Sequence, residues 1–171
     1  MSKEPIRILA IAPVPRGLGV CVLDDTGALI RSCVREVREK LDRKNAAAME
    51  ELRKLIEKHL PHIIVLENHL RSRYHKRKRI AELLSLMEEH AREGGLGVVK
   101  YSREEVREAL GLPENGNKDE VAAKVAGRLR MLRRQVPRKK EVWDAERYGM
   151  SIFTAAGLGL THLSRALSGS R

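Results

Sequence analysis

Two runs of apolar residues near the start of the chain predict a hairpin of buried strands. The first run covers 6–14 and the second covers 18–23, and a turn rich in proline and glycine separates them. Continuous apolar runs of this length are typical of strands that are buried on both faces. A less regular apolar pattern over 28–37 predicts a third antiparallel strand.

Apolar positions that recur at three, four and seven residues predict the helices. The first such pattern covers 38–60 and ends at Pro61, and the short apolar run over 63–66 is typical of a central strand. A capping box at Ser102 predicts the start of a later helix. The remaining predicted elements are a helix over 80–91, a strand over 96–101, and helices over 102–110, 118–132 and 144–167.

The order of these elements predicts an α/β fold. Three meandering strands, followed by helical crossovers to further strands, give a mixed five-stranded sheet with helices on both faces. No internal repeat or low-complexity segment divides the chain, so we expect one domain over residues 1–171. Alanine and glycine between 155 and 159 favour close packing of the last helix against the sheet.

The charge of the chain points to a class of partner. There are 34 Lys and Arg against 23 Asp and Glu, which gives a net charge of +11. This excess favours a polyanion, with nucleic acid ahead of an acidic membrane surface. The first residues form neither a signal peptide nor a membrane span, so we expect a cytoplasmic protein, associated with the nucleoid if it binds DNA. Cys21 and Cys33 lack metal-ligand spacing and are expected to be small buried side chains.

Two basic segments are the candidates for phosphate contact. In the block 71–79, six of nine residues are Lys or Arg, and they precede a helix. Positive charge at a helix N-terminus is unfavourable, because it opposes the helix dipole. This cost favours a role in phosphate contact over the alternative that the block is only a solvated helix start. Tyr74 within the block could stack on an exposed base. With the second basic segment, 128–140, the predicted nucleic-acid-binding residues are Arg71, Arg73, Tyr74, Lys76, Arg77, Lys78, Arg79, Arg133, Arg134, Arg138, Lys139 and Lys140.

Four segments together resemble the RuvC-like branch of the ribonuclease H-like superfamily. They are ILAIAPVPRGLGVCVLDDTG, PHIIVLEN, NKDEVAAKVAGRL and MSIFTAAGLGLTHL, and they span most of the chain. The resemblance implies a ribonuclease H-like sheet and a homodimer that acts on four-way DNA junctions. It also implies a cluster of ligands, mostly carboxylates, that holds two divalent cations for phosphodiester hydrolysis.

This sequence departs from the family at most of the ligand positions that the resemblance implies. These positions fall on Ala12, Glu67, near Ser151 and on Thr154, and the family's active-site lysine falls on Lys118. Of the four ligand positions, Glu67 alone keeps a carboxylate, so we expect two-metal catalysis to fail and no metal cofactor to be needed. Mg²⁺ or Mn²⁺ would be required if nuclease activity remains. Glu67 is then either a residual metal ligand or, as we expect, paired with a base such as Lys118.

The sequence therefore predicts a RuvC-like protein that binds branched or duplex DNA without cleaving it. One alternative is an active junction endonuclease with a rearranged metal site, built from Glu67 with Asp144, Glu146 or His69. On a continuous helix over 144–167, however, Glu146 would lie about 12 Å from Thr154 along the axis. A second alternative is a structural component of a larger nucleoprotein assembly. A homodimer, if formed, is expected to use the second helix.

Overall fold

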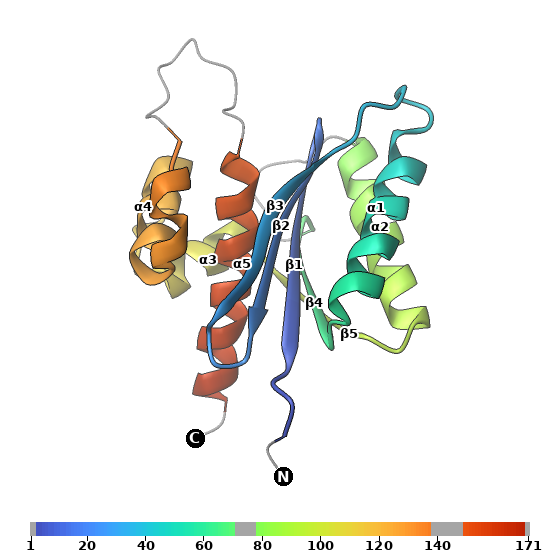
Figure 1. The fold of residues 1–171 in the computed structure, drawn as a ribbon. Coiled ribbons are helices and arrows are strands. Elements are labelled where there is room, and N and C mark those ends of the chain that lie inside the picture. Colours follow the sequence, from blue (N-terminus) through green and yellow to red (C-terminus); the bar gives the residue numbers. More distant parts are fainter. Residues whose placement is uncertain (1–2, 71–77, 138–148, 170–171) are drawn as a thin grey trace.

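The five predicted strands form one mixed sheet in the order β3-β2-β1-β4-β5 (Figure 1). The computed structural model describes residues 3–70, 78–137 and 149–169. The first three strands pair antiparallel, whereas β4 runs parallel to both β1 and β5. This topology confirms the predicted mixed sheet. The strands are β1 Arg7–Val14, β2 Gly17–Asp24, β3 Leu29–Glu36, β4 Ile63–Glu67 and β5 Gly97–Tyr101.

Helices cover both faces of the sheet, as predicted (Figure 1). On one face lie α1 Lys44–His59 and α2 Lys78–Glu93. On the other lie α3 Arg103–Ala109, α4 Lys118–Arg128, the 3-10 helix η1 Arg130–Gln135 and α5 Met150–Ser168. Among the described residues, no helix is both long enough and apolar enough to span a membrane.

The alternation of side chains along β1 divides the hydrophobic core into two layers. Ile8, Ala10 and Ala12 pack in the layer with α5, whereas Leu9 and Ile11 pack in the layer with α1 and α2. Successive side chains of a strand point to opposite faces, so a sheet covered on both sides needs apolar residues at every position. This requirement explains why the opening segment is continuously apolar.

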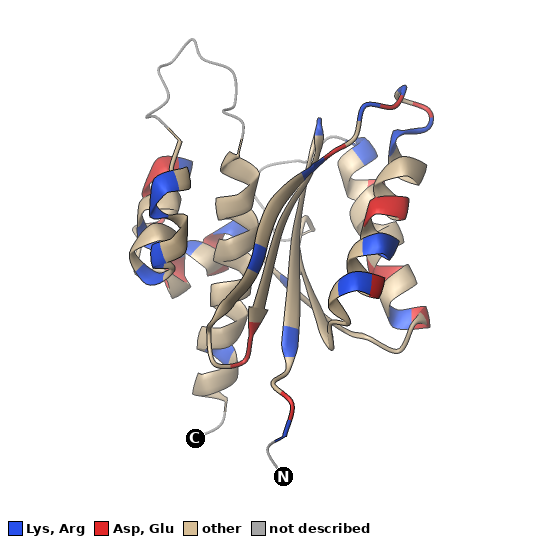
Figure 2. Ribbon diagram, in the orientation of Figure 1, with Lys and Arg blue, Asp and Glu red and all other residues tan. Residues whose placement is uncertain are grey.

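Small residues allow α5 to lie directly on the sheet. A Cβ atom added at Gly19 of β2 would lie 2.2 Å from the carbonyl oxygen of Ser151. A Cβ atom added at Gly159 of α5 would lie 2.8 Å from a methyl carbon of Leu23. Figure 2 shows that α5 is nearly free of charged residues, which fits this buried position. The close packing predicted for the last helix is confirmed.

Two predicted helix boundaries are wrong. The helix predicted over 38–60 begins at Lys44, because the polar residues before it offer little apolar surface to bury and Leu41 is 76% exposed. The helix predicted over 118–132 ends at Arg128, where the chain tightens into η1.

The last helix also starts later than predicted, at Met150. Gly149 has φ 90°, a left-handed conformation that glycine adopts readily and that a continuous helix cannot contain. The distance of about 12 Å expected between Glu146 and Thr154 assumed one continuous helix from residue 144. Because the helix begins at Met150, that estimate no longer applies. Asp144 and Glu146 lie outside the described residues.

The two cysteines behave as small side chains of the core. Cys21 is buried in the layer with α5, and Cys33 packs at the edge of the opposite layer. Both are free thiols. Burial, with a smaller contribution from Cys33, raises the pKa of Cys21 to about 12, so this thiol stays protonated.

Replacement of Gly19 by alanine tests the contact between α5 and the sheet. We expect the G19A protein to be destabilised by about 3 kcal/mol, because its methyl group must displace the backbone at Ser151. Thermal unfolding should then shift down by on the order of 10 °C. The matched control is G127A in α4, where nothing lies within 4 Å and the change should be neutral or slightly stabilising. Equal melting temperatures for the two variants would contradict the packing described here.

Candidate functional site

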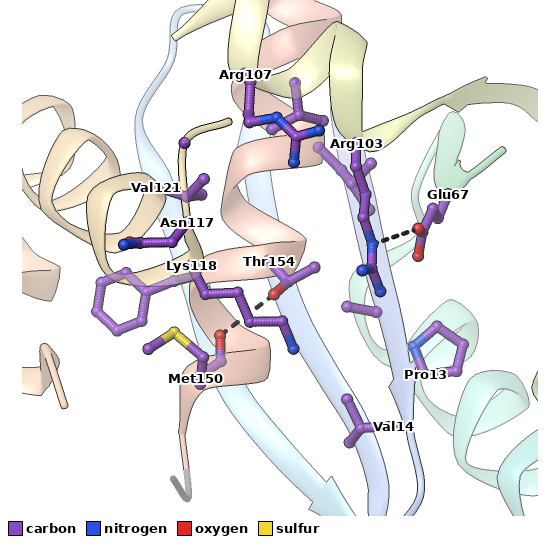
Figure 3. Close-up of a pocket in the computed structure, with 15 residues that line it drawn as sticks. Pro13, Val14, Glu67, Arg103, Arg107, Asn117, Lys118, Val121, Met150 and Thr154 are labelled. Atoms are coloured by element: carbon purple, nitrogen blue, oxygen red, sulfur yellow. Dashed lines mark hydrogen bonds and ion pairs between the residues drawn. The ribbon is translucent and has the colours of Figure 1, made fainter. Parts of the chain in front are cut away.

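A pocket lies where β1 and β4 end, between these strands and the helices α3, α4 and α5 (Figure 3). Its volume is about 300 Å³. Ala12, Glu67, Lys118 and Thr154 all line it. Four of the five positions that the family resemblance selected thus meet in one place, although they are far apart in the sequence.

The register of the parallel strands brings the first two of these positions together. The last paired residues of β1 and β4 are Ala10 and Val65, and Ala12 and Glu67 each lie two residues further along. Because side chains alternate, Ala12 and Glu67 point to the same face as Ala10 and Val65, which is the face that α5 covers. Parallel strands end at the same edge of the sheet, so this edge collects the functional positions.

The Glu67 carboxylate is buried and paired with an arginine. Glu67 is 3% exposed, and the Nε atom of Arg103 donates a hydrogen bond of 2.9 Å to its Oε1 atom. Pairing of Glu67 with a base was predicted, but Lys118 was the base suggested and Arg103 is the partner seen here. Ion pairs that are withdrawn from water and hydrogen-bonded in this way hold their geometry.

Two further basic side chains point into the same pocket (Figure 3). Arg107 lies one turn after Arg103 on α3, and its side chain is 12% exposed. Its Nε atom is buried without a hydrogen-bond partner among the described residues. Lys118 is the first residue of α4, which begins with a capping box between Asn117 and Glu120. The described residues that line the pocket therefore include three basic groups and a single carboxylate.

The two positions on α5 have different surroundings. Thr154 lines the pocket, and its hydroxyl donates to the carbonyl oxygen of Met150 at 3.5 Å. Ser151 is buried against Gly19 of β2 and is not among the residues that line the pocket. Neither residue brings a carboxylate to the site.

The described residues do not fit the two divalent cations that the fold family implies. Such cations need oxygen ligands and negative charge. Ala12 offers a methyl group, Thr154 offers a neutral hydroxyl, and Glu67 is already neutralised by Arg103. Within residues 3–70, 78–137 and 149–169, no three His, Cys, Asp or Glu side chains are grouped so as to hold a metal ion.

The histidine considered as a rearranged ligand is not among the residues that line the pocket. His69 follows β4, and its Nδ1 atom is buried without a hydrogen bond to any described residue. His162 of α5 instead has a clear partner, because its Nδ1 atom lies 2.9 Å from the Tyr101 hydroxyl. Burial lowers the pKa of His162, which favours its neutral form in this packed position.

The structure describes part of the two basic segments. Lys78, Arg133 and Arg134 are exposed. Arg79 is held in place, because it donates hydrogen bonds to Asn45 of α1 at 2.9 Å and to the carbonyl oxygen of Pro15 at 3.5 Å. It therefore braces α2 against α1 and the first hairpin. The other predicted contacts lie outside the described residues, namely Arg71, Arg73, Tyr74, Lys76, Arg77, Arg138, Lys139 and Lys140.

Arg103 and Arg107 were missed as site residues, although the sequence carried a signal for them. Arg103 follows the end of β5 by two residues, and Tyr101 pairs with Glu67 in the parallel register of β4 and β5. Residues that follow neighbouring parallel strands meet at the same edge of the sheet. Arg107 then follows from the helical spacing, since residues four apart share a face.

Removal of Arg103 tests whether the buried pair supports the fold. R103M should lower the free energy of unfolding by about 3 kcal/mol, because the buried carboxylate of Glu67 loses the cation that is hydrogen-bonded to it. The double variant E67L/R103M should recover most of this stability. The control is R92M, which removes a pair in which the arginine side chain is 60% exposed and Glu88 keeps its second partner Lys100, so the change should cost less than about 1 kcal/mol. Chemical denaturation of the wild-type protein and the three variants measures these free energies of unfolding. An R103M protein as stable as the wild type would contradict the pairing.

Three solved structures share this fold over nearly the whole chain. RuvC of Thermus thermophilus matches with a TM-score of 0.72 and 21% identity, covering 96% of this chain and 97% of the other. RuvC of T. thermophilus in complex with a Holliday junction substrate matches with a TM-score of 0.70 and 19% identity over the same shares of both chains. The yeast mitochondrial Holliday junction resolvase matches with a TM-score of 0.56 and 15% identity, covering 98% of this chain and 84% of the other.

These similarities confirm the predicted RuvC-like, ribonuclease H-type fold. Comparison with protein-family models and with the sequences of curated proteins gives no match.

Proposed function

We propose that this protein binds branched DNA, with four-way junctions as the preferred form, and does not cleave it. The observation that carries the proposal is the Glu67–Arg103 pair at the centre of the pocket. Among the described residues that line the pocket, Glu67 is the one carboxylate, and its contact with Arg103 offsets the negative charge that two divalent metals would need. The fold is kept while the chemistry of the site has changed.

The preference for DNA junctions rests on the similar structures and on charge. One of the similar structures is bound to a Holliday junction substrate, and another is a Holliday junction resolvase. The net charge of +11 suits a polyanion of that size. In Figure 2 basic residues occur on α1, α2 and α4, in both helical layers. A homodimer that joins two such domains would present two pockets to one junction.

The decisive experiment is incubation of the purified protein with a labelled four-way junction, with and without Mg²⁺ or Mn²⁺. We expect a shifted complex and no cleavage products under either condition, because the described residues of the site lack the ligands that would hold a water-activating metal ion. The E67Q protein serves as the control. Metal-dependent cleavage that E67Q abolishes would overturn the proposal and would establish a rearranged nuclease site.

Neutralisation of the basic block tests the predicted binding of phosphates. We expect the triple change Lys76→Gln, Arg77→Gln and Lys78→Gln to weaken junction binding for every sequence. It should also lower the dependence of log K on log salt by about 0.9 for each phosphate that the variant no longer neutralises. Arg79 is left intact because it braces α2.

The matched control removes three exposed basic residues of α1, namely Arg53, Lys54 and Lys58, and so changes the net charge by the same amount. Fluorescence anisotropy at several salt concentrations measures both variants. Equal salt slopes would place the phosphate-binding residues elsewhere on the protein. Co-sedimentation of the wild-type protein with a large particle from lysate, without junction binding, would favour a structural role in a nucleoprotein assembly.

A further inference from the structure

We propose that the pocket binds a phosphate of the nucleic-acid backbone directly, with the Arg103 guanidinium serving where a metal ion would otherwise bridge protein and phosphate. The nature of the ligand rests on the proposed function. The existence of an anion site rests on the pocket alone. Three observations support it, namely the positive charges that line the pocket, the unused hydrogen-bond donor of Arg107 and the two helix N-termini at the pocket.

The charges that line the pocket favour an anion. Arg103, Arg107 and Lys118 contribute three positive charges, and Glu67 contributes one negative charge. The Glu67 carboxylate holds the Arg103 side chain in place by accepting a hydrogen bond from the Nε atom of Arg103. A guanidinium has five N–H donors in a planar fork, so it can hold a carboxylate and contact a phosphate at the same time. The Arg103 side chain is 33% exposed, which places it between the buried carboxylate and the open part of the pocket.

Arg107 has a donor that the described protein groups do not use. Its side chain is largely buried, and its Nε atom has no hydrogen-bond partner among them. The ion pair with Glu104 is long, at 3.7 Å. A buried donor without an acceptor is costly, and rotation of the guanidinium toward a bound phosphate would bring this donor to an acceptor. Figure 3 shows the Arg107 guanidinium directed into the same pocket as Arg103 and Lys118.

Two helices begin at the pocket. Lys118 is the first residue of α4 and Met150 is the first residue of α5, and both line the cavity. The N-terminal end of a helix carries partial positive charge and stabilises anions. These ends add to the three basic side chains and oppose a divalent cation at the same place.

The remaining lining suits a nucleotide. The walls include Pro13, Val14 and Phe153, which can pack against a sugar while the basic groups hold its phosphate. The volume of about 300 Å³ is large enough for a sugar-phosphate unit. An arginine neutralises a phosphodiester but does not ionise water as a metal does, so binding at this site proceeds without hydrolysis.

The test uses the full chain in EDTA and the dinucleotide TpT, which carries a single phosphodiester. In NMR titrations, TpT should shift the Nε–H signals of Arg103 and Arg107 and the backbone amide of Lys118. R107Q should abolish the shift of Arg103 and weaken junction binding about tenfold, the value of one charge-assisted hydrogen bond. R107Q leaves the Glu67–Arg103 pair in place, and thermal unfolding of the variant shows whether loss of the Arg107–Glu104 pair affects folding. R165Q, on the outer part of α5, is the control and should change neither result.

The outcomes separate this inference from the proposed function. Junction binding that R107Q leaves unchanged, with no TpT shift, would overturn the pocket site while the proposed function stands. TpT shifts at Arg107 and Lys118 without junction binding would support the pocket site while the proposed function fails. Binding of TpT that requires added Mn²⁺, with paramagnetic broadening at Glu67, would overturn the inference by showing a metal where Arg103 is proposed to act.

Discussion

A buried carboxylate must be neutralised, and the whole candidate site depends on how this chain meets that requirement. Glu67 stands at the end of a central strand and is almost fully withdrawn from water. In that environment an unpaired charge is prohibitively costly, and either a bound cation or a basic side chain can compensate it. Here Arg103 does so from just beyond the end of the neighbouring parallel strand. The guanidinium adds positive charge at this edge of the sheet, which supports the anion site that we propose there.

The strands and the helix that surround this ion pair are held in place by contacts that do not depend on the charges of the pair. The parallel register of β1, β4 and β5 brings their carboxyl ends to one edge, and the contact between Gly19 and Ser151 holds α5 against it. Neither feature needs a metal ion. This independence explains how a fold similar to that of junction resolvases can form here although most of the expected ligand positions carry no carboxylate.

Most of the fold could be predicted from the sequence, because burial on both faces of a sheet and on one face of a helix leaves a periodic pattern. The mixed sheet and the two helical layers followed from that pattern and from topology rules, whereas the spatial order of the strands came from the structure. The errors lie at helix ends. The start of α1 depends on how much apolar surface Leu41 finds to bury, and the start of α5 depends on the left-handed conformation of Gly149. Both are decided by the surrounding chain.

The residue types alone establish which of the expected positions can supply a side-chain oxygen ligand, because the methyl side chain of Ala12 has no oxygen in any fold. They also place Glu67 at a strand end and predict that a base neutralises it. The sequence places Arg103 two residues beyond the next strand, but the choice of Arg103 over Lys118 as that base depends on the register of β4 and β5, which only the tertiary structure fixes. The same holds for Arg107, whose buried Nε–H donor becomes meaningful only when the helices close the pocket around it.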